Sequence, residues 1–174
     1  MNARDVIVAT SACFVLGLVA PAPAVAARCP PGVFLSIDGD PPGPAGSVDK
    51  SAGGVVLSEA QVMAIPSTVI KTSTEWTPTS RFEGPPLSAV LALAGVRGRS
   101  IRLFALDDYS ITIPWSDMER YGIILAHSQN GERLSKRKFG PLFLIYPRDQ
   151  FRSALDTPTG VEKFIWQVCR IDVE

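Results

Sequence analysis

Apolar and polar residues alternate over two neighbouring stretches, 101–105 and 109–113, as they do in strands that bury one face. Asp107 and Asp108 lie between these stretches, and aspartate is common in tight turns because its side chain bonds nearby backbone groups. The pattern therefore predicts a β-hairpin, in which the two aspartates are turn residues rather than a shared acid and base.

A second hairpin is predicted at Asn130-Gly131, because both residues tolerate the positive φ angles of a two-residue turn. Residues 39–51 are rich in proline and glycine, which indicates a surface loop. Five further stretches, rich in β-branched or apolar residues, are predicted to be strands: 33–37, 68–73, 123–126, 142–146 and 164–173.

Residues 86–94 carry the clearest helix pattern of the chain. Pro86 suits the first helical position, apolar residues recur every three or four positions, and Gly95 ends the pattern. Two shorter helices are predicted from capping boxes, in which a serine and a residue three positions later cap each other's backbone. The boxes are Ser58 with Gln61, before a helix that ends at Pro66, and Ser116 with Glu119, before a helix that ends near Gly122.

The order of these elements favours an α+β fold with a mixed β-sheet and short helices. Hairpins are frequent, and no regular βαβ repeat is present. One domain is expected, since a domain of roughly 150 residues already buries roughly 68–70% of its extended surface, which is enough for a single core.

The first 26 residues have the features of a secretory signal peptide. Residues 6–20 form an apolar run that is shorter than the about 20 residues of a membrane-spanning helix. Residues 24–26, Ala-Val-Ala, form a small-x-small cleavage signal. We expect cleavage there and a mature periplasmic domain of residues 27–174. An uncleaved anchor is the alternative, because Asp5 partly offsets the charge of Arg4.

Charge and cysteine content narrow the classes of partner. The chain has 17 lysines and arginines against 17 aspartates and glutamates, so no excess positive charge favours nucleic acid. Cys29 and Cys169 follow the leader, and export would allow them to form a disulfide; two unrelated thiols are the alternative. The only histidine is His127, so no zinc site is predicted.

A basic run follows the second hairpin, and its members are Arg133, Lys136, Arg137 and Lys138. Such a run can hold a phosphate or another anion, and a solvated hairpin arm without a ligand is the alternative. Trp76 is unusual because it lies in the polar stretch 74–80; it either lines a pocket or covers the core.

Motifs of catalysis are scarce. The chain has no serine in a strand-turn-helix elbow, no metal-spaced histidines and no glycine-rich phosphate loop. His127 is the one candidate for a general base, although a lone histidine beside a hairpin is more often structural.

Several short motifs occur in a characteristic order. They are Phe82-Glu-Gly-Pro-Pro-Leu87 ahead of Ala94-Gly95, Ala105-Leu-Asp-Asp-Tyr109 with Ile113-Pro114, Asn130-Gly131-Glu132 with Leu134, Gly140-Pro141-Leu142 with Tyr146-Pro147, and Lys163 with Trp166 and Ile171. Together they resemble the oxidoreductase molybdopterin-binding domain family, which includes the sulfite oxidases. The resemblance covers residues 33–173 and implies a sulfite-oxidase-like fold with a ligand cleft.

The resemblance also implies where a catalytic member would bind molybdenum, through a cysteine thiolate just before the first of these motifs. Here residues 71–76 read Lys-Thr-Ser-Thr-Glu-Trp. A hydroxyl is a harder and far less acidic ligand than a thiolate. Catalytic members usually carry an arginine after Gly-Pro-Leu, where this chain has Phe143. Short exported single-domain relatives, by resemblance, share the pattern of Ser73-Thr-x-Trp76.

We therefore expect a non-catalytic periplasmic binding or sensory module, with neither catalytic nor metal-ligating residues. Its expected partners are a small molecule or an anion, and a membrane-bound redox or signalling protein. The residues expected to line its cleft are Thr72, Ser73, Trp76, Asp107, Asp108, Tyr109, Arg137, Lys138 and Tyr146. The alternative is a molybdopterin-dependent oxidoreductase, or a subunit of one, with a non-cysteine metal ligand.

Overall fold

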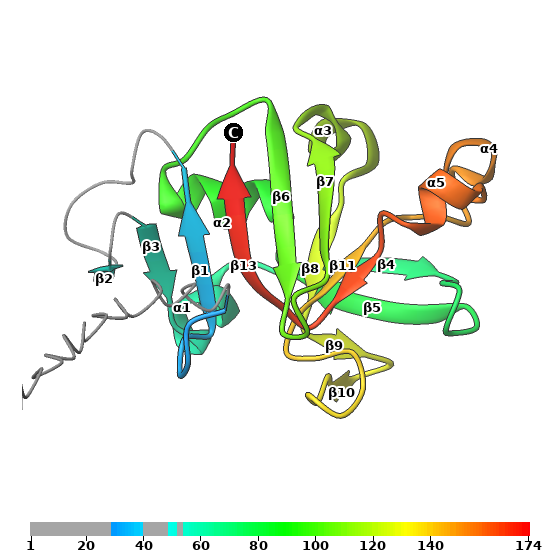
Figure 1. Ribbon diagram of the computed structural model, residues 1–174. Coiled ribbons are helices and arrows are strands. Elements are labelled where there is room, and N and C mark those ends of the chain that lie inside the picture. Colours follow the sequence, from blue (N-terminus) through cyan, green and yellow to red (C-terminus); the bar gives the residue numbers. More distant parts are fainter. Residues whose placement is uncertain (1–28, 40–48, 52–53) are drawn as a thin grey trace, which may run out of the picture.

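The computed structural model describes residues 29–39, 49–51 and 54–174 (Figure 1). The expected signal peptide and its cleavage site lie outside the described residues, as does most of the expected loop at 39–51. The last three residues of that expected loop form a strand, because they pair with the strand that follows.

The described strands form three sheets. The six-stranded sheet has the order β2 (Asp49–Ser51), β3 (Gly54–Leu57), β1 (Leu35–Asp38), β13 (Val168–Val173), β6 (Ser100–Ala105) and β7 (Ser110–Pro114). The four-stranded sheet has the order β10 (Glu132–Arg133), β9 (Ser128–Gln129), β5 (Ser80–Gly84) and β4 (Thr68–Thr72). The three-stranded sheet has the order β12 (Ile165–Trp166), β11 (Phe143–Ile145) and β8 (Ile124–Ala126).

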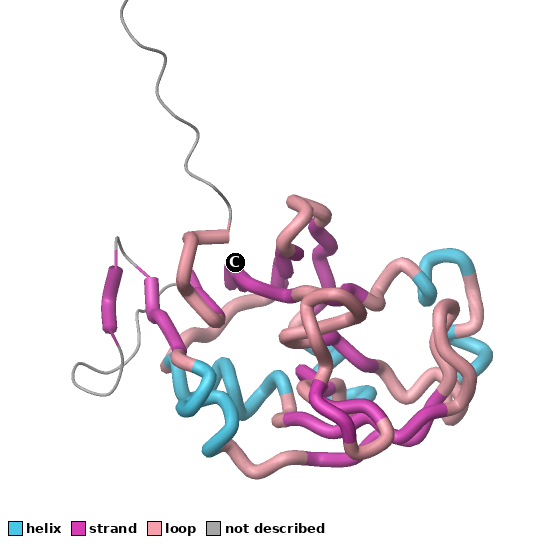
Figure 2. The backbone as a smooth tube through the Cα atoms, turned by 90° about the horizontal axis from the view of Figure 1, so that it is seen from below, coloured by secondary structure: helices cyan, strands magenta, loops and turns pink. Residues whose placement is uncertain are grey.

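Only one strand pair in the described part of the chain is parallel, that of β1 with β13, in which Ser36 lies opposite Arg170. The six-stranded sheet is therefore mixed, and the predicted α+β class is confirmed. The helices are α1 (Glu59–Ala64), α2 (Leu87–Ala94), α3 (Ser116–Tyr121), α4 (Arg152–Leu155) and α5 (Pro158–Val161). Figure 2 shows helical segments at both ends of the molecule, at the left where α1 lies and at the right where α4 and α5 lie.

Helix α2 lies behind the six-stranded sheet in Figure 1 and buries Leu87, Val90, Leu91 and Ala94. Its predicted end is confirmed, since Gly95 adopts a left-handed conformation with φ of 73°. The capping box before α1 is also confirmed: the backbone N–H of Gln61 donates to the Ser58 hydroxyl, and that of Ser58 donates to the Gln61 side chain.

The predicted capping box at Ser116 and Glu119 is wrong. Trp115 already has helical φ and ψ, so Ser116 lies inside the first turn of α3, and no side chain caps this end. Asp117 of the same turn is buried and bonds core side chains instead.

Both predicted hairpins are present. In the turn between β6 and β7, Asp108 has a φ of 67°, and the backbone N–H of Ala105 donates to the carbonyl of Tyr109. In the turn between β9 and β10, Asn130 and Gly131 have φ of 53° and 85°, as a type I′ turn requires.

The predicted strand at 164–173 is interrupted at Gln167, which has a φ of 56° and separates β12 from β13. The backbone groups of Gln167 bond loops on either side, with its N–H donating to Phe139 and its carbonyl accepting from Leu106. Strands β3 and β5 and helices α4 and α5 were not predicted. For α5 a signal existed, because Thr157 caps the helix and Pro158 occupies its first position.

A disulfide joins Cys29 to Cys169, with their Cα atoms 5.7 Å apart, as predicted from export and the even cysteine count. It ties the segment before β1 to β13, the strand beside which β1 lies.

Gly84 of the Phe-Glu-Gly motif lies where β5 passes closely over β8. A Cβ atom there would lie 2.6 Å from the Cα of Ala126 and would collide with the Leu125 carbonyl. The chain segments are joined nearby, because the Leu125 N–H donates to the Pro85 carbonyl and the His127 N–H to the Glu83 carbonyl. The glycine thus serves close packing of two strands.

We predict that Gly84→Ala lowers the free energy of unfolding by about 1–3 kcal/mol, as overpacking of a dense interior does. Urea denaturation followed by circular dichroism measures this change. Ser88→Ala, on the exposed side of α2, is the matched control and should remain within about 0.5 kcal/mol of wild type. Equal stability of Gly84→Ala and wild type would show that the close approach is absent.

Candidate functional site

The segment after β4 is held by Asp149, a residue that lies 76 positions further along the chain than Ser73. The backbone N–H of Ser73 donates to Asp149 Oδ2 at 3.0 Å, and the Ser73 hydroxyl donates to Oδ1 at 2.7 Å. In return, the Asp149 N–H donates to the hydroxyl of the buried Thr72 at 3.1 Å. We call these three residues the Asp149 clamp.

The clamp satisfies the hydroxyl groups that lie where the resemblance places a metal ligand. The Thr72 hydroxyl also donates to the Ser73 carbonyl, and Thr79 donates a further bond to the Asp149 carboxylate. The hydrogen bond from the Ser73 hydroxyl is the largest cause that lowers the pKa of Asp149, against the opposing effect of burial. The carboxylate is therefore ionised at neutral pH and accepts three hydrogen bonds.

Trp76 is positioned by the turn that follows the clamp. The hydroxyl of the buried Thr74 accepts hydrogen bonds from the backbone N–H groups of Trp76, at 3.2 Å, and Thr77, at 3.0 Å. The Trp76 side chain is 43% exposed, although its ring packs edge-on against Trp166 with 4.4 Å between the ring centroids.

Five rings form an aromatic cluster between this turn and β11: Trp76, Phe82, Phe139, Phe143 and Trp166. Phe143 is the centre, with no exposed surface, and lies 6.5 Å from Trp76, 5.8 Å from Phe82 and 5.1 Å from Phe139 between centroids. At these separations the rings are in mutual contact, so the space between Trp76 and Phe143 is filled by side chains.

A cavity of about 280 Å³ opens beside the cluster, and we call it the aromatic cavity. Its lining residues come from the turn after β4, the β6–β7 turn, the end of α5 and β12: Trp76, Ala105, Asp107, Tyr109, Val161, Glu162, Phe164 and Trp166. Three of the residues expected to line a cleft, Trp76, Asp107 and Tyr109, thus come together. Asp107 shapes the turn, since its carboxylate accepts the Tyr109 backbone N–H at 3.1 Å.

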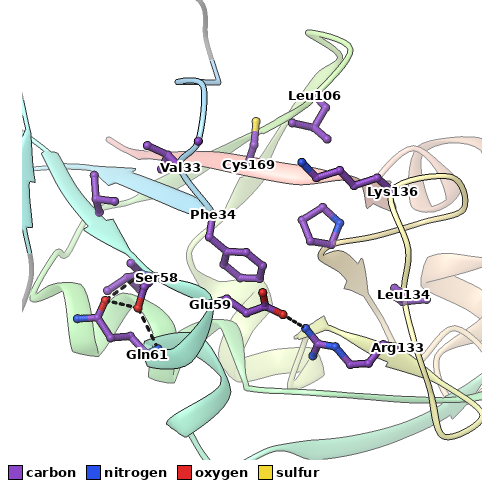
Figure 3. A pocket seen from close by; sticks show the side chains of 14 residues that line it. Val33, Phe34, Ser58, Glu59, Gln61, Leu106, Arg133, Leu134, Lys136 and Cys169 are labelled. Atoms are coloured by element: carbon purple, nitrogen blue, oxygen red, sulfur yellow. Dashed lines mark hydrogen bonds and ion pairs between the residues drawn. The ribbon is translucent and has the colours of Figure 1, made fainter.

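A larger cavity of about 720 Å³ lies between the segment before β1, the start of α1 and the loop before β11 (Figure 3). Most of its polar groups are paired with one another. Arg133 forms an ion pair with Glu59 at 2.5 Å, and Ser58 bonds Gln61 in the capping box. Phe34 lies between this ion pair and Cys169 in Figure 3, and Lys136 lies on the side of Cys169.

The basic run therefore does not meet Trp76. Arg133 forms its ion pair with Glu59, and Lys136 borders the larger cavity. Arg137 and Lys138, in the loop between β10 and β11, border neither of these two cavities. The expectation that the two cations lie in one cleft with Trp76 is not supported by the geometry.

Tyr146 is placed in the core rather than at a cavity wall, which corrects its expected position. It has no exposed surface, and its hydroxyl donates to Asp117 at 2.9 Å, which also accepts from Lys163 at 2.6 Å. Burial, followed by the neighbouring Asp117, raises the pKa of Tyr146 far above its ordinary value. This group of three polar residues anchors α3 to β11.

His127 bonds two serine hydroxyls. Its Nε2 lies 3.1 Å from Ser67 Oγ, and its Nδ1 lies 2.7 Å from Ser128 Oγ. Burial, followed by the charge of Arg133, lowers the pKa of His127, so the ring is neutral at pH 7. It borders neither of the two cavities described above, and the structural interpretation is favoured.

Sequence reasoning missed Asp149, Glu162 and Phe164. Asp149 and Glu162 are single carboxylates in unremarkable loops, so no local pattern indicates their partners. Phe164 and Trp166 alternate in one apolar stretch, which marked a strand but not the wall of a cavity.

The arrangement of mixed sheet, hairpins and short helices defines a sulfite-oxidase-like α+β domain. The model of the family described as oxidoreductase molybdopterin binding domain matches residues 58–151, and the chain belongs to this family. Among solved structures, it is similar to the sulfane dehydrogenase SoxCD from Paracoccus pantotrophus, with a TM-score of 0.55 and 20% sequence identity. The match covers 80% of this chain and 37% of that one, and at this identity it shows the fold alone.

No curated protein matches the chain significantly. In the described part of the chain, no helix has the length and apolar character needed to cross a membrane.

The residues present do not fit molybdenum held by a protein thiolate. The hydroxyls of Thr72 and Ser73 are engaged by Asp149, and Phe143 occupies the position of the arginine that catalytic members carry, by resemblance. Cys169 is bonded to Cys29 and faces the larger cavity. A thiolate ligand would have to come from elsewhere.

We predict that Asp149→Ala lowers the free energy of unfolding by about 1.5–3 kcal/mol at pH 7, because hydrogen bonds to a charged group are lost. Since the pKa of Asp149 is lowered in the folded protein, its contribution is complete above its ordinary pKa of about 3.9 and is lost as pH falls through the lowered value. The difference in the free energy of unfolding between wild type and Asp149→Ala should therefore shrink below about pH 4.

Urea denaturation across this pH range measures this difference. Glu59→Ala is the control, because it removes an ion pair with Arg133 in which both side chains are about half exposed, and it should cost at most about 1 kcal/mol. If the loss of stability in Asp149→Ala did not depend on pH, or were no larger than that of the control, Asp149 would not hold the segment after β4.

Proposed function

We propose that this protein is an exported, non-catalytic member of the molybdopterin-binding domain family that binds a small molecule in the aromatic cavity. The observation that carries the proposal is the coincidence of two features of one segment. The clamp and the aromatic cluster occupy the region of the metal ligand, and the same segment presents Trp76 to an open cavity.

The donor set supports the absence of molybdenum chemistry. By resemblance, catalytic members hold molybdenum through a soft thiolate, and here the hydroxyls of Thr72 and Ser73 are bonded within the protein. Opening the site would break the charge-assisted bonds of Asp149 and separate Trp76 from Phe143, both of which stabilise the present arrangement.

The aromatic cavity is favoured over the larger one as the binding site. Trp76 and Tyr109 stay 43% and 49% exposed at the aromatic cavity, and exposed aromatic side chains are common at recognition sites. In the larger cavity, the charged and capping side chains of Ser58, Glu59 and Arg133 already have partners.

The amino-terminal sequence supports the periplasm as the place of action. There the protein would report or deliver its ligand to a membrane-bound redox or signalling partner, in keeping with its small size and its neutral charge.

The test is the cofactor content of the protein purified from the periplasm of cells that make molybdenum cofactor. We predict molybdenum far below one atom per chain, and no pterin fluorescence after oxidation. A cysteine-bearing member of the family, expressed in the same cells, is the positive control. Stoichiometric molybdenum with pterin would overturn the proposal and favour an oxidoreductase with a non-cysteine ligand.

A further inference from the structure

We propose that the aromatic cavity selects a compact organic cation, such as a methylated ammonium group with a short apolar substituent. This inference rests on the proposed function, since it names the ligand class of the same cavity. The basic run predicted an anionic ligand, but that run does not line the aromatic cavity, and the ligand proposed here is a cation.

The walls of the cavity have the composition of an aromatic cage. Four of its lining side chains are aromatic: Trp76, Tyr109, Phe164 and Trp166. The Trp76 and Trp166 rings meet at 75°, so they form two walls of a corner. Rings set around a cation attract it through their negative faces, and methylated ammonium groups are well suited to such cages because they are weakly hydrated.

The charged side chains that line the aromatic cavity are both acidic. Asp107 and Glu162 line it and are exposed, and no lysine or arginine does. The nearest basic side chain along the chain, Lys163, bonds the buried Asp117 at 2.6 Å. Arg148 forms ion pairs with Glu75, the neighbour of Trp76, and with Asp156. A ligand cation would therefore enter without displacing a resident one.

The carboxylates and the aromatic rings of the cavity would contribute to binding in different ways. Exposed carboxylates at the rim attract a cation over a distance of about one Debye length, an effect that salt screens. The aromatic walls supply contact energy that salt affects little.

Size and charge both disfavour a phosphorylated ligand. The volume of about 280 Å³ is at the lower limit of cavities for drug-sized ligands, which span about 300–1,000 Å³. A phosphate dianion placed here would lie next to Asp107 and Glu162, and like charges at short range repel. The cavity is therefore better suited to a cation than to a phosphorylated ligand.

The test is a titration of the full chain with three probes of matched shape: choline, its neutral isostere 3,3-dimethyl-1-butanol, and the anion 3,3-dimethylbutyrate. Chemical shifts in two-dimensional NMR locate binding. We expect choline to bind about 5-fold to 30-fold more tightly than the neutral isostere, as cation–π attraction predicts, and the anion not to bind. Shifts should be confined to residues 74–77, 105–109 and 161–166.

Variants separate the contribution of the aromatic rings from that of the carboxylates. Trp76→Ala should abolish choline binding, and Trp76→Phe should keep part of it, which guards against loss of folding as the cause. Asp107→Asn should weaken binding at low salt and remove most of its salt dependence. Glu132→Gln, an exposed carboxylate of β10 that does not line the cavity, is the matched control and should bind choline like wild type.

Equal binding of choline and the neutral isostere would overturn the cation assignment while leaving the cavity as a binding site. Binding of the anion instead, or of no probe at tens of millimolar concentration, would also overturn it. The molybdenum content, measured independently, shows whether the proposed function fails as well.

Discussion

The carboxylate of Asp149 is the constraint on which the site depends. It accepts three hydrogen bonds, two from Ser73 and one from Thr79, and the Asp149 backbone N–H donates a fourth to Thr72. These bonds join the end of β4 to the loop after β11, two segments far apart in the sequence. With Ser73 held, the turn at Thr74 presents Trp76 towards β12. The ring of Trp76 then closes the aromatic cluster on one side and borders the aromatic cavity on the other.

The motifs that mark the family explain the scaffold better than they explain chemistry. Gly84 allows β5 to pass over β8, and a side chain at Gly140 would collide with the backbone of Leu134 and Ser135. Asn130 forms the turn between β9 and β10 and accepts the Arg81 N–H. These roles are needed with or without a metal, so membership of the family specifies the fold and leaves the ligand to a few other residues.

Features that depend on neighbours along the chain could be predicted from sequence. The two hairpins, the capping box at Ser58 and the helix ending at Gly95 all rest on backbone preferences within a few residues. The kink at Gln167 could not be predicted, because its cause is hydrogen bonding to Phe139 and Leu106, which come from distant loops.

The site residues also divide into those whose surroundings can be predicted from neighbouring residues and those whose partners are distant in the sequence. Trp76, Asp107 and Tyr109 were identified because an exposed aromatic in a polar stretch and a hairpin turn are visible locally. Tyr146 was misplaced because its partner, Asp117, belongs to another element. The Asp149 clamp went unseen because a single aspartate carries no sign of which distant serine it will bind.

Titration of the Asp149 carboxyl carbon by NMR, in wild type and in Ser73→Ala, tests directly whether this carboxylate holds the segment after β4. If it does, the pKa of Asp149 is below the ordinary value of about 3.9 in wild type and moves back towards that value in the variant. An ordinary pKa in wild type, unchanged by Ser73→Ala, would mean that the segment after β4 is not held by Asp149. The region of the metal ligand would then be open to a cofactor.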